Sequence, residues 1–200
     1  GLTMVLAGMK EPPKRKQKVE QPILVATQSV ENRDTNARVP VIGNISAKNK
    51  IEIYSEVNGV LLNNKKQFLE GVTFKKGESL VKINSDEYYQ SLKAQKSSFM
   101  NQLTQVLPDL KIDYPDAYER FKSFLSDFQL DKRMPALPKA ATDQEKYFLA
   151  GRNIYQLYYD IAAMEEKLDK YILQAPFTGV VTSSLIKPGT LVRSGQKLGE

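Results

Sequence analysis

Two groups of carboxylates have the residue types and spacing that could support catalysis. One group consists of Asp109, Asp113 and Asp116, and the other of Glu165 and Glu166. Paired carboxylates can act as a general acid and a general base. The chain contains no His and no Cys, so the usual near-neutral acid–base group and the commonest nitrogen and sulfur ligands of zinc are missing. We therefore interpret both groups as charges on a loop and a solvated helix, and we expect no enzymatic activity, no cofactor and no metal site.

Two tyrosine pairs, Tyr88-Tyr89 and Tyr158-Tyr159, could form a platform on which a ligand stacks. Both pairs lie in segments with helical periodicity, which favours a place in a core or along a helical seam. The chain also lacks a phosphate-binding loop, a dinucleotide fingerprint and a calcium loop. These observations favour a structural or binding protein over an enzyme.

Positive charge is concentrated at the N-terminus. The net charge is +6, and residues 1–18 carry +4 of it, which leaves the rest of the chain nearly balanced. A basic groove for nucleic acid is therefore not expected. Residues 1–9 are apolar but too few to span a bilayer, which needs about 20 residues. They are either the end of a signal or anchor segment or a plain flexible end, and we interpret residues 1–22 as a basic linker.

Residues 86–171 have the pattern of a long antiparallel helical hairpin. Apolar residues recur in steps of three, four and seven from Asp86 to Leu107, interrupted at Gln95 and Lys96, and Pro108 is expected to end this helix. A return helix is predicted from about Asp143 to Tyr171, where a seven-residue repeat sets the seam. The members of this repeat are Tyr147, Ile154, Ile161 and Leu168. A helix with one narrow apolar stripe needs a partner, and the preceding helix is the nearest one.

The connection between the two long helices contains a short aromatic helix. Apolar residues indicate a helix over Asp116–Phe128, and Pro115 suits its first turn. The segment Thr142 to Glu145 has a capping pattern for the return helix. By chain order, the tip of the hairpin is expected within Pro108–Pro138.

Short strands are predicted on both sides of this hairpin. Residues 23–50 contain two β-prone runs, interpreted as strands that lead into a partial barrel or a membrane-proximal region. Residues 51–85 and 172–200 alternate β-prone segments with glycines, which are typical of tight turns.

The two glycine-rich segments repeat each other. In each, a Gly-Val pair precedes two glycines that are six residues apart, and a Leu follows the last glycine by three positions. The glycines assigned to turns are Gly59, Gly71, Gly77, Gly179, Gly189 and Gly195. Each segment is too small to bury its own apolar face. We therefore predict an α+β fold in which both segments form one β-sandwich, interrupted by the helical hairpin.

The second segment resembles the second lipoyl-like half-motif of membrane fusion proteins, the periplasmic adaptors of resistance-nodulation-division-type tripartite efflux pumps and related secretion systems. The resemblance lies in Ala175-Pro-Phe-Thr-Gly-Val-Val181, Pro188-Gly-Thr-Leu-Val192 and Gly195-Gln-Lys-Leu-Gly199. The first segment is similar to the first half-motif through Val57-Asn-Gly-Val60, Glu70-Gly71 and Lys76-Gly-Glu-Ser-Leu80.

This resemblance implies a structural role in export. The lipoyl-like domains of several copies would pack side by side, and the protein would link an inner-membrane transporter to an outer-membrane channel of the TolC type. It would act on the periplasmic side of the inner membrane of a Gram-negative cell, held there by an anchor outside residues 1–200. Exposed basic residues expected near the hairpin tip, and therefore proposed as partner contacts, are Arg120, Lys132 and Arg133.

Three alternatives remain beside this interpretation. The protein could serve an ABC-type or type I secretion exporter instead. It could be a coiled-coil protein that binds nucleic acid through Lys14-Arg-Lys16, with a salt-sensitive affinity. It could carry a cofactor on a lysine, although Lys82 and Lys170 flank the helices and neither lies in the tight hairpin that such carriers use.

Overall fold

A computed structural model describes residues 23–31, 38–43 and 49–200 of the chain. The chain divides into two units, residues 1–45 and 46–200. The strands of the second unit are β1 (Ile53–Tyr54), β2 (Gly59–Val60), β3 (Thr73–Phe74), β4 (Ser79–Lys82), β5 (Ile172–Gln174), β6 (Gly179–Val180), β7 (Leu191–Val192) and β8 (Lys197–Gly199). Its helices are α1 (Asp86–Asp113), α2 (Pro115–Asp127), α3 (Asp143–Gly151) and α4 (Ile154–Asp169).

The strands expected in residues 23–50 do not form in the described part of that range. Residues 23–31 and 38–43 have no helix or strand, and their apolar side chains, such as Leu24 and Ile42, are exposed. A strand needs a neighbour for its backbone N–H and C=O groups, and no ladder among the described residues includes these segments. Residues 32–37 and 44–48, together with the basic linker at 1–22, lie outside the described residues.

The β-domain combines the two repeated segments strand by strand. It contains four two-stranded antiparallel ladders, β1–β8, β2–β7, β3–β6 and β4–β5, and each joins one strand from residues 51–85 to one from residues 172–200. Exchanging every strand for its counterpart in the other segment leaves this set of ladders unchanged. The repeat seen in the sequence is therefore a two-fold pseudo-symmetry of the fold.

Four glycine N–H groups follow the same pseudo-symmetry. Gly71 donates to the carbonyl of Val181 and Gly189 to that of Leu61, at N···O distances of 2.9 and 2.8 Å. In the same way, Gly77 donates to Ala175 at 2.8 Å and Gly195 to Ser55 at 2.7 Å. Each turn therefore binds the opposite segment, so neither segment is complete alone.

The same four glycines have the backbone conformation that tight turns need. Their φ angles lie between +82° and +84°, and each is the third residue of a turn closed by a hydrogen bond between the first and fourth residues. In one of them the Thr190 N–H donates to the Lys187 carbonyl at 3.1 Å. A positive φ at this position is the mark of a type II turn and favours glycine. The other two predicted turn glycines, Gly59 and Gly179, lie instead in strands β2 and β6. A Cβ on Gly59 would come within 2.6 Å of the Ile83 side chain, so this glycine allows close packing rather than a turn.

A single apolar core fills the β-domain, and both segments contribute to it. The residues at or below 5% exposure are Val57, Leu61, Phe74, Leu80, Val81, Ile83, Ala175, Val181, Val192 and Leu198. Burying this set requires both halves, which explains why the chain must return from its helices to finish the domain.

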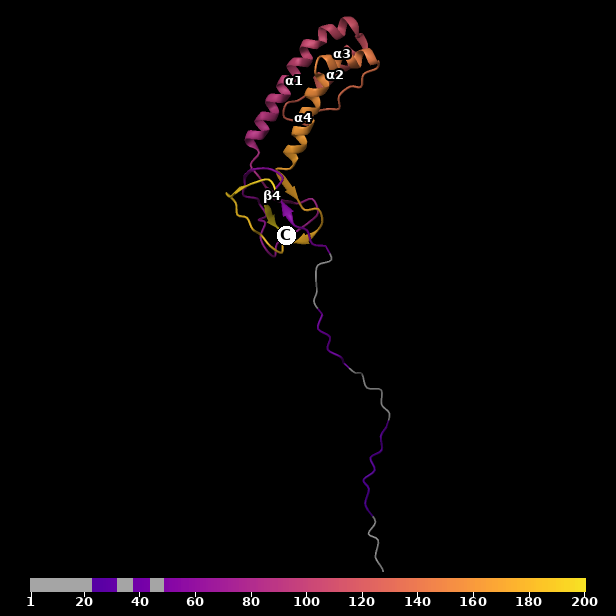
Figure 1. Ribbon diagram of the computed structural model, residues 1–200, viewed down its shortest axis with the longest axis vertical. Coiled ribbons are helices and arrows are strands. Elements are labelled where there is room, and N and C mark those ends of the chain that lie inside the picture. Colours follow the sequence, from indigo (N-terminus) through magenta and orange to yellow (C-terminus); the bar gives the residue numbers. More distant parts are fainter. Residues whose placement is uncertain (1–22, 32–37, 44–48) are drawn as a thin grey trace, which may run out of the picture. The chain divides into compact units, whose positions relative to one another are not determined.

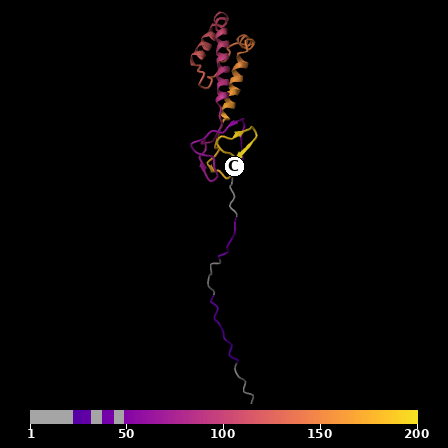
Figure 2. The ribbon, with the colours of Figure 1, turned by 90° about the vertical axis from the view of Figure 1, so that its left-hand side faces the viewer.

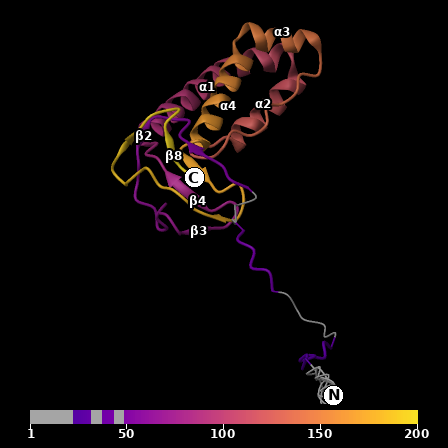
Figure 3. The ribbon, with the colours of Figure 1, turned by 60° about the horizontal axis from the view of Figure 1, so that its bottom comes forward.

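The helical insert, residues 86–171, leaves the β-domain after β4 and returns at β5. Helices α1 and α4 lie side by side and run in opposite directions, with α2 and α3 towards the far end (Figure 1). Two further views show the insert extending from one end of the β-domain, with α2 beside α1 (Figures 2 and 3). Asn84 Oδ1 accepts the N–H of Asp86 at the start of α1, whereas Ser85, which precedes the helix, makes no side-chain cap.

Helix α1 does not end at Pro108, contrary to the prediction, but continues to Asp113. Pro108 is exposed, and so is Thr104, whose carbonyl loses its N–H partner to the proline. Val106 and Leu110 on the opposite face are buried in the core of the insert. Because the core continues past Pro108, packing outweighs the lost hydrogen bond.

The predicted return helix is also wrong, because it is split in two. Helix α3 ends at Gly151, and Asn153 adopts φ 59° before α4 begins at Ile154. Asn is one of the few residues that enter this left-handed region at modest cost. Thr142 caps α3 by accepting the N–H of Glu145, as the capping pattern predicted. The hairpin thus consists of two outer arms, α1 and α4, with α2, a connecting loop and α3 packed against them.

Candidate functional site

The end of the insert farthest from the β-domain is formed by the α1–α2 junction and α3. Tyr114, between α1 and α2, packs on Phe148 of α3 with ring centroids 5.5 Å apart. Two large side chains at this end face solvent, Ile112 with 79% exposure and Tyr147 with 70%. The seven-residue repeat did not indicate this surface, because it predicts Tyr147 on the seam of a continuous helix. In the sequence, Gly151 and Asn153 were the signal that the helix is interrupted between α3 and α4.

Arg120, predicted as a partner contact, is bound within the insert. Its Nη2 atom donates to both carboxylate oxygens of Glu145, at 2.7 and 2.8 Å. Glu145 is 3% exposed, and its Oε2 also accepts the N–H of Ala141 at 3.0 Å. The pair joins α2, α3 and the loop before α3. Arg120 therefore holds these elements together.

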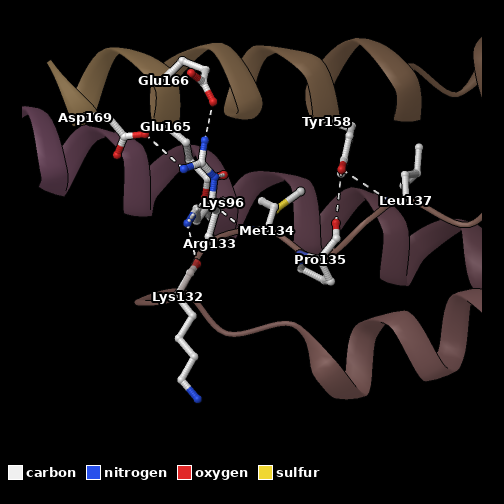
Figure 4. Close-up of polar contacts among 10 residues, drawn as sticks. All are labelled: Lys96, Lys132, Arg133, Met134, Pro135, Leu137, Tyr158, Glu165, Glu166 and Asp169. Atoms are coloured by element: carbon white, nitrogen blue, oxygen red, sulfur yellow. Dashed lines mark hydrogen bonds and ion pairs between the residues drawn. The ribbon is translucent and has the colours of Figure 1, made fainter. Parts of the chain in front are cut away.

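Lys132 and Arg133, the other predicted contacts, lie towards the β-domain end of the insert. Arg133 pairs with Glu166 and, at 3.0 Å, with Asp169, the last residue of α4. Chain order placed these residues near the tip, but after α2 the chain has already run back along the outer arms. Figure 4 shows the Lys132 side chain pointing away from this cluster, and Lys132 is exposed. Lys132 and Arg133 are thus separated from Ile112 and Tyr147 by much of the length of α4.

A buried ion pair lies under the same loop. Lys96 on α1 and Glu165 on α4 are 3% and 7% exposed, and their Nζ and Oε1 atoms are 2.6 Å apart. Lys96 Nζ also donates to the carbonyl of Lys132 at 2.7 Å, and Glu165 Oε1 accepts the N–H of Met134 at 3.0 Å (Figure 4). In the sequence, Lys96 interrupts the apolar stripe of α1, but its pairing with Glu165 was not predicted. Opposite charges at inward positions of two facing helices were the available signal.

The tyrosine pairs have structural contacts. The rings of Tyr88 and Tyr171 stack with centroids 5.4 Å apart at the junction with the β-domain, and burial raises the pKa of both phenols. Tyr158 OH donates to the carbonyl of Pro135 at 3.2 Å and accepts the N–H of Leu137 at 3.3 Å. Two of the four paired tyrosines, Tyr88 and Tyr158, thus serve packing or the loop. Tyr89 lies under the Lys93 ammonium, 5.4 Å from its ring centroid, and Tyr159 is exposed next to Tyr158.

Three of the five carboxylates that could have supported catalysis are paired with cations. Asp109 binds Arg152 at 2.7 Å, Glu165 binds Lys96, and Glu166 binds Arg133. Within the described ranges, no group of three or more metal-ligating side chains is arranged to hold an ion. These carboxylates therefore serve as partners of cations within the insert.

The β-domain has an apolar hollow of about 430 Å³. Phe68, Phe74 and Phe177 line it, and the charged residues at its rim, Lys50 and Glu200, pair with each other at 2.6 Å. Lys170, one of the two lysines weighed as a carrier, is bound to Glu56 at 2.5 Å, and Lys82 is the last residue of β4. Neither lysine occupies a hairpin turn.

The chain matches a known protein family. Residues 49–199 match the family described as "RND MFP, barrel-sandwich hybrid domain". A comparison with curated protein sequences found no match. None of the helices in the described part of the chain is long and apolar enough to cross a bilayer.

Solved structures resemble this chain at low sequence identity. A candidate efflux transporter from Bacteroides eggerthii is 19% identical, aligns with 74% of this chain and 38% of its own length, and gives a TM-score of 0.50. MacA from Actinobacillus actinomycetemcomitans is 21% identical over 76% of this chain and 48% of its own, with a TM-score of 0.44. The chain thus spans less than half the length of either protein. Because the family match covers most of the chain, the protein belongs to the RND membrane fusion protein family, whose members are adaptors of efflux systems and not enzymes.

Proposed function

We propose that the protein is a periplasmic adaptor subunit of a tripartite efflux pump, which links an inner-membrane transporter to an outer-membrane channel of the TolC type in a Gram-negative cell. One observation carries this proposal. The chain leaves the β-domain at Lys82, makes the helical insert, and returns at Ile172 to complete the same four ladders. Because strands from both sides of the insert pair with each other, the β-domain fixes both ends of the insert. The insert extends from it as an arm (Figure 1).

Contact with the channel would use the far end of the insert. Ile112 and Tyr147 expose large apolar surface there, and aromatic side chains are common anchors of protein interfaces. Arg120 and Arg133 bind internal carboxylates, so we assign them to the stability of the insert. Lys132 is exposed and directed outward, and it remains a candidate for contact with a partner along the side of the arm.

Assembly into a homo-oligomer would use the β-domains. Val60 and Leu191 are direct cross-strand partners in the β2–β7 ladder and are 42% and 58% exposed. Two adjacent apolar side chains on one ladder suit burial against a neighbouring copy, since removing apolar area from water stabilises association. Several β-domains side by side would then line a conduit for export.

Site-specific photo-crosslinking in cells tests the proposal on the full-length protein. A photoreactive residue at Ile112 or Tyr147 should trap an outer-membrane channel protein, and one at Val60 should trap a second copy of the chain. Lys75, exposed in a β-domain turn, serves as the control for the far-end positions and should not trap the channel. Capture of cytoplasmic proteins alone from Ile112 and Tyr147 would refute the adaptor function.

A further inference from the structure

Residues 129–141, here called the strap, connect α2 to α3 without regular secondary structure. The strap runs along α1 and α4, and its side chains Leu130, Met134 and Leu137 are only partly buried. Besides the ion pairs of the Arg133 side chain with Glu166 and Asp169 on α4, polar contacts hold the strap at three places. These lie at its beginning, its middle and its end.

The first contact is the buried pair of Lys96 and Glu165. Neither residue belongs to the strap, yet each binds a strap backbone group, the carbonyl of Lys132 and the N–H of Met134. A buried charge is costly unless its partners satisfy it. With the strap in place, this pair obtains from the strap backbone the hydrogen bonds that water would otherwise supply.

The middle and final contacts are also polar. Tyr158 binds the strap through the carbonyl of Pro135 and the N–H of Leu137. Glu145, held by Arg120, accepts the N–H of Ala141 at the end of the strap. Water can replace each of these contacts once the strap lifts. Lifting an apolar segment of this length would instead expose surface that water does not stabilise.

We propose that the strap is a releasable conformational element, which opens locally while α1 and α4 stay packed, and that the Lys96–Glu165 pair is its latch. On opening, water solvates Lys96 and Glu165, which remain paired across the two helices. The strap also determines how firmly α3 is held, because it joins α3 to the base of the insert. Its release would leave α3 tied to the far end by Arg120 and the Tyr114–Phe148 contact. This inference goes beyond the adaptor function and does not depend on it.

Amide hydrogen exchange on the full chain tests the opening directly. In the unmodified protein, the N–H groups of Met134 and Leu137 should exchange faster than those of Leu103 in α1 and Ile161 in α4, since local opening requires less free energy than global unfolding. Equal rates at all four amides would mean that the strap opens only when the whole insert unfolds. That result would overturn the proposal.

A charge reversal tests whether the ion pair is the latch. Lys96→Glu combined with Glu165→Lys keeps opposite charges on α1 and α4. It nevertheless places an acceptor against the Lys132 carbonyl and a donor against the Met134 N–H. Exchange at Met134 should rise by about ten- to a hundredfold, the range expected for hydrogen bonds to charged groups, while Leu103 stays protected. Unchanged exchange at Met134 would show that the pair only joins the two helices.

Two further variants keep the test decisive. Reversing the exposed pair through Asp109→Arg with Arg152→Asp is the matched control, since this pair has no contact with the strap, and it should leave exchange at Met134 unchanged. Tyr158→Phe removes the middle contact without touching the latch, so exchange at Leu137 should rise even if the charge-reversed protein does not fold. No change at Leu137 in Tyr158→Phe would contradict a strap held by polar contacts.

Discussion

Arg120 on α2 brings its Nη2 atom to 2.7 and 2.8 Å from the two carboxylate oxygens of Glu145 on α3. Glu145 is almost fully buried, whereas Arg120 retains about a third of its side-chain exposure. From the sequence, a basic residue in the short helix near the expected hairpin tip is predicted to be a surface contact. Its partner is 25 residues away, in a helix whose orientation depends on a break that was not predicted.

The variant Arg120→Met should lower the free energy of unfolding by about 1–3 kcal/mol, because it leaves the Glu145 carboxylate buried without its cation. Urea denaturation followed by circular dichroism measures this change. Lys132→Met, which removes another of the predicted contacts at an exposed position, is the control and should change the value by less than about 0.5 kcal/mol. If both variants changed the free energy of unfolding by the same small amount, Arg120 would be a surface residue available to a partner and not a structural one.

Gly189 provides a test of the turn geometry. Its φ is +84°, and a Cβ there would meet no atom within 4 Å, so Gly189→Ala isolates the backbone cost. We expect a loss of about 1–2 kcal/mol in thermal or urea unfolding. Gly151→Ala is the control, since this helical glycine has no positive φ and similarly open surroundings, and it should be neutral or stabilising by up to about 1 kcal/mol. Equal losses at both positions would argue against the turn assignment.

The glycine spacing predicted the architecture of the β-domain because turns of this type depend on local geometry. Gly71, Gly77, Gly189 and Gly195 have matching φ angles and matching hydrogen bonds to the opposite segment. Gly59 and Gly179 have the same residue type but a different role. For Gly59, tertiary packing against Ile83 gives that role, and no local pattern contains this information, whereas a Cβ on Gly179 would meet the ring of Phe177, two residues earlier in the chain.

The helical insert was less predictable because long-range contacts determine its turns. Ile154 and Ile161 are fully buried as the seven-residue repeat predicted, but Tyr147, a member of the same repeat, is exposed on α3. The repeat cannot reveal that the chain turns at Asn153. Similarly, Lys132 was assigned to the tip because chain order was the only guide, whereas the Lys96 and Glu165 contacts place it near the base.

Pro108 offers a stabilising substitution. The proline is exposed inside α1, and its missing N–H leaves the Thr104 carbonyl without a helical hydrogen bond. Pro108→Ala restores that bond and removes no buried side chain, so the free energy of unfolding should rise by about 1–3 kcal/mol. Urea denaturation tests this, with Thr104→Ala as an exposed control on the same helix. A loss of stability in Pro108→Ala would show that the packing of α1 requires the proline.

Glu200 should make stability depend on pH in the acid range. Hydrogen bonds from Lys50 first and Lys197 second lower the pKa of this carboxyl to about 2, from an ordinary value of 4.5. A lowered pKa in the folded state means that folding favours the ionised form. The stabilisation is therefore complete above the unfolded pKa of about 4.5 and is lost as the pH falls towards about 2.

The comparison of Glu200→Gln with the unmodified protein measures this contribution. The unmodified protein should melt at the higher temperature near neutral pH, and the difference should shrink as the pH falls below about 4.5. Lys50→Met should raise the pKa of Glu200 towards its ordinary value, since the Lys50 hydrogen bond is the largest cause of the shift. It should therefore narrow the pH range over which the difference in melting temperature declines. A melting difference between Glu200→Gln and the unmodified protein that stays constant from about pH 7 to about pH 3 would mean that packing around residue 200, rather than the ionised carboxylate, holds β8 in place.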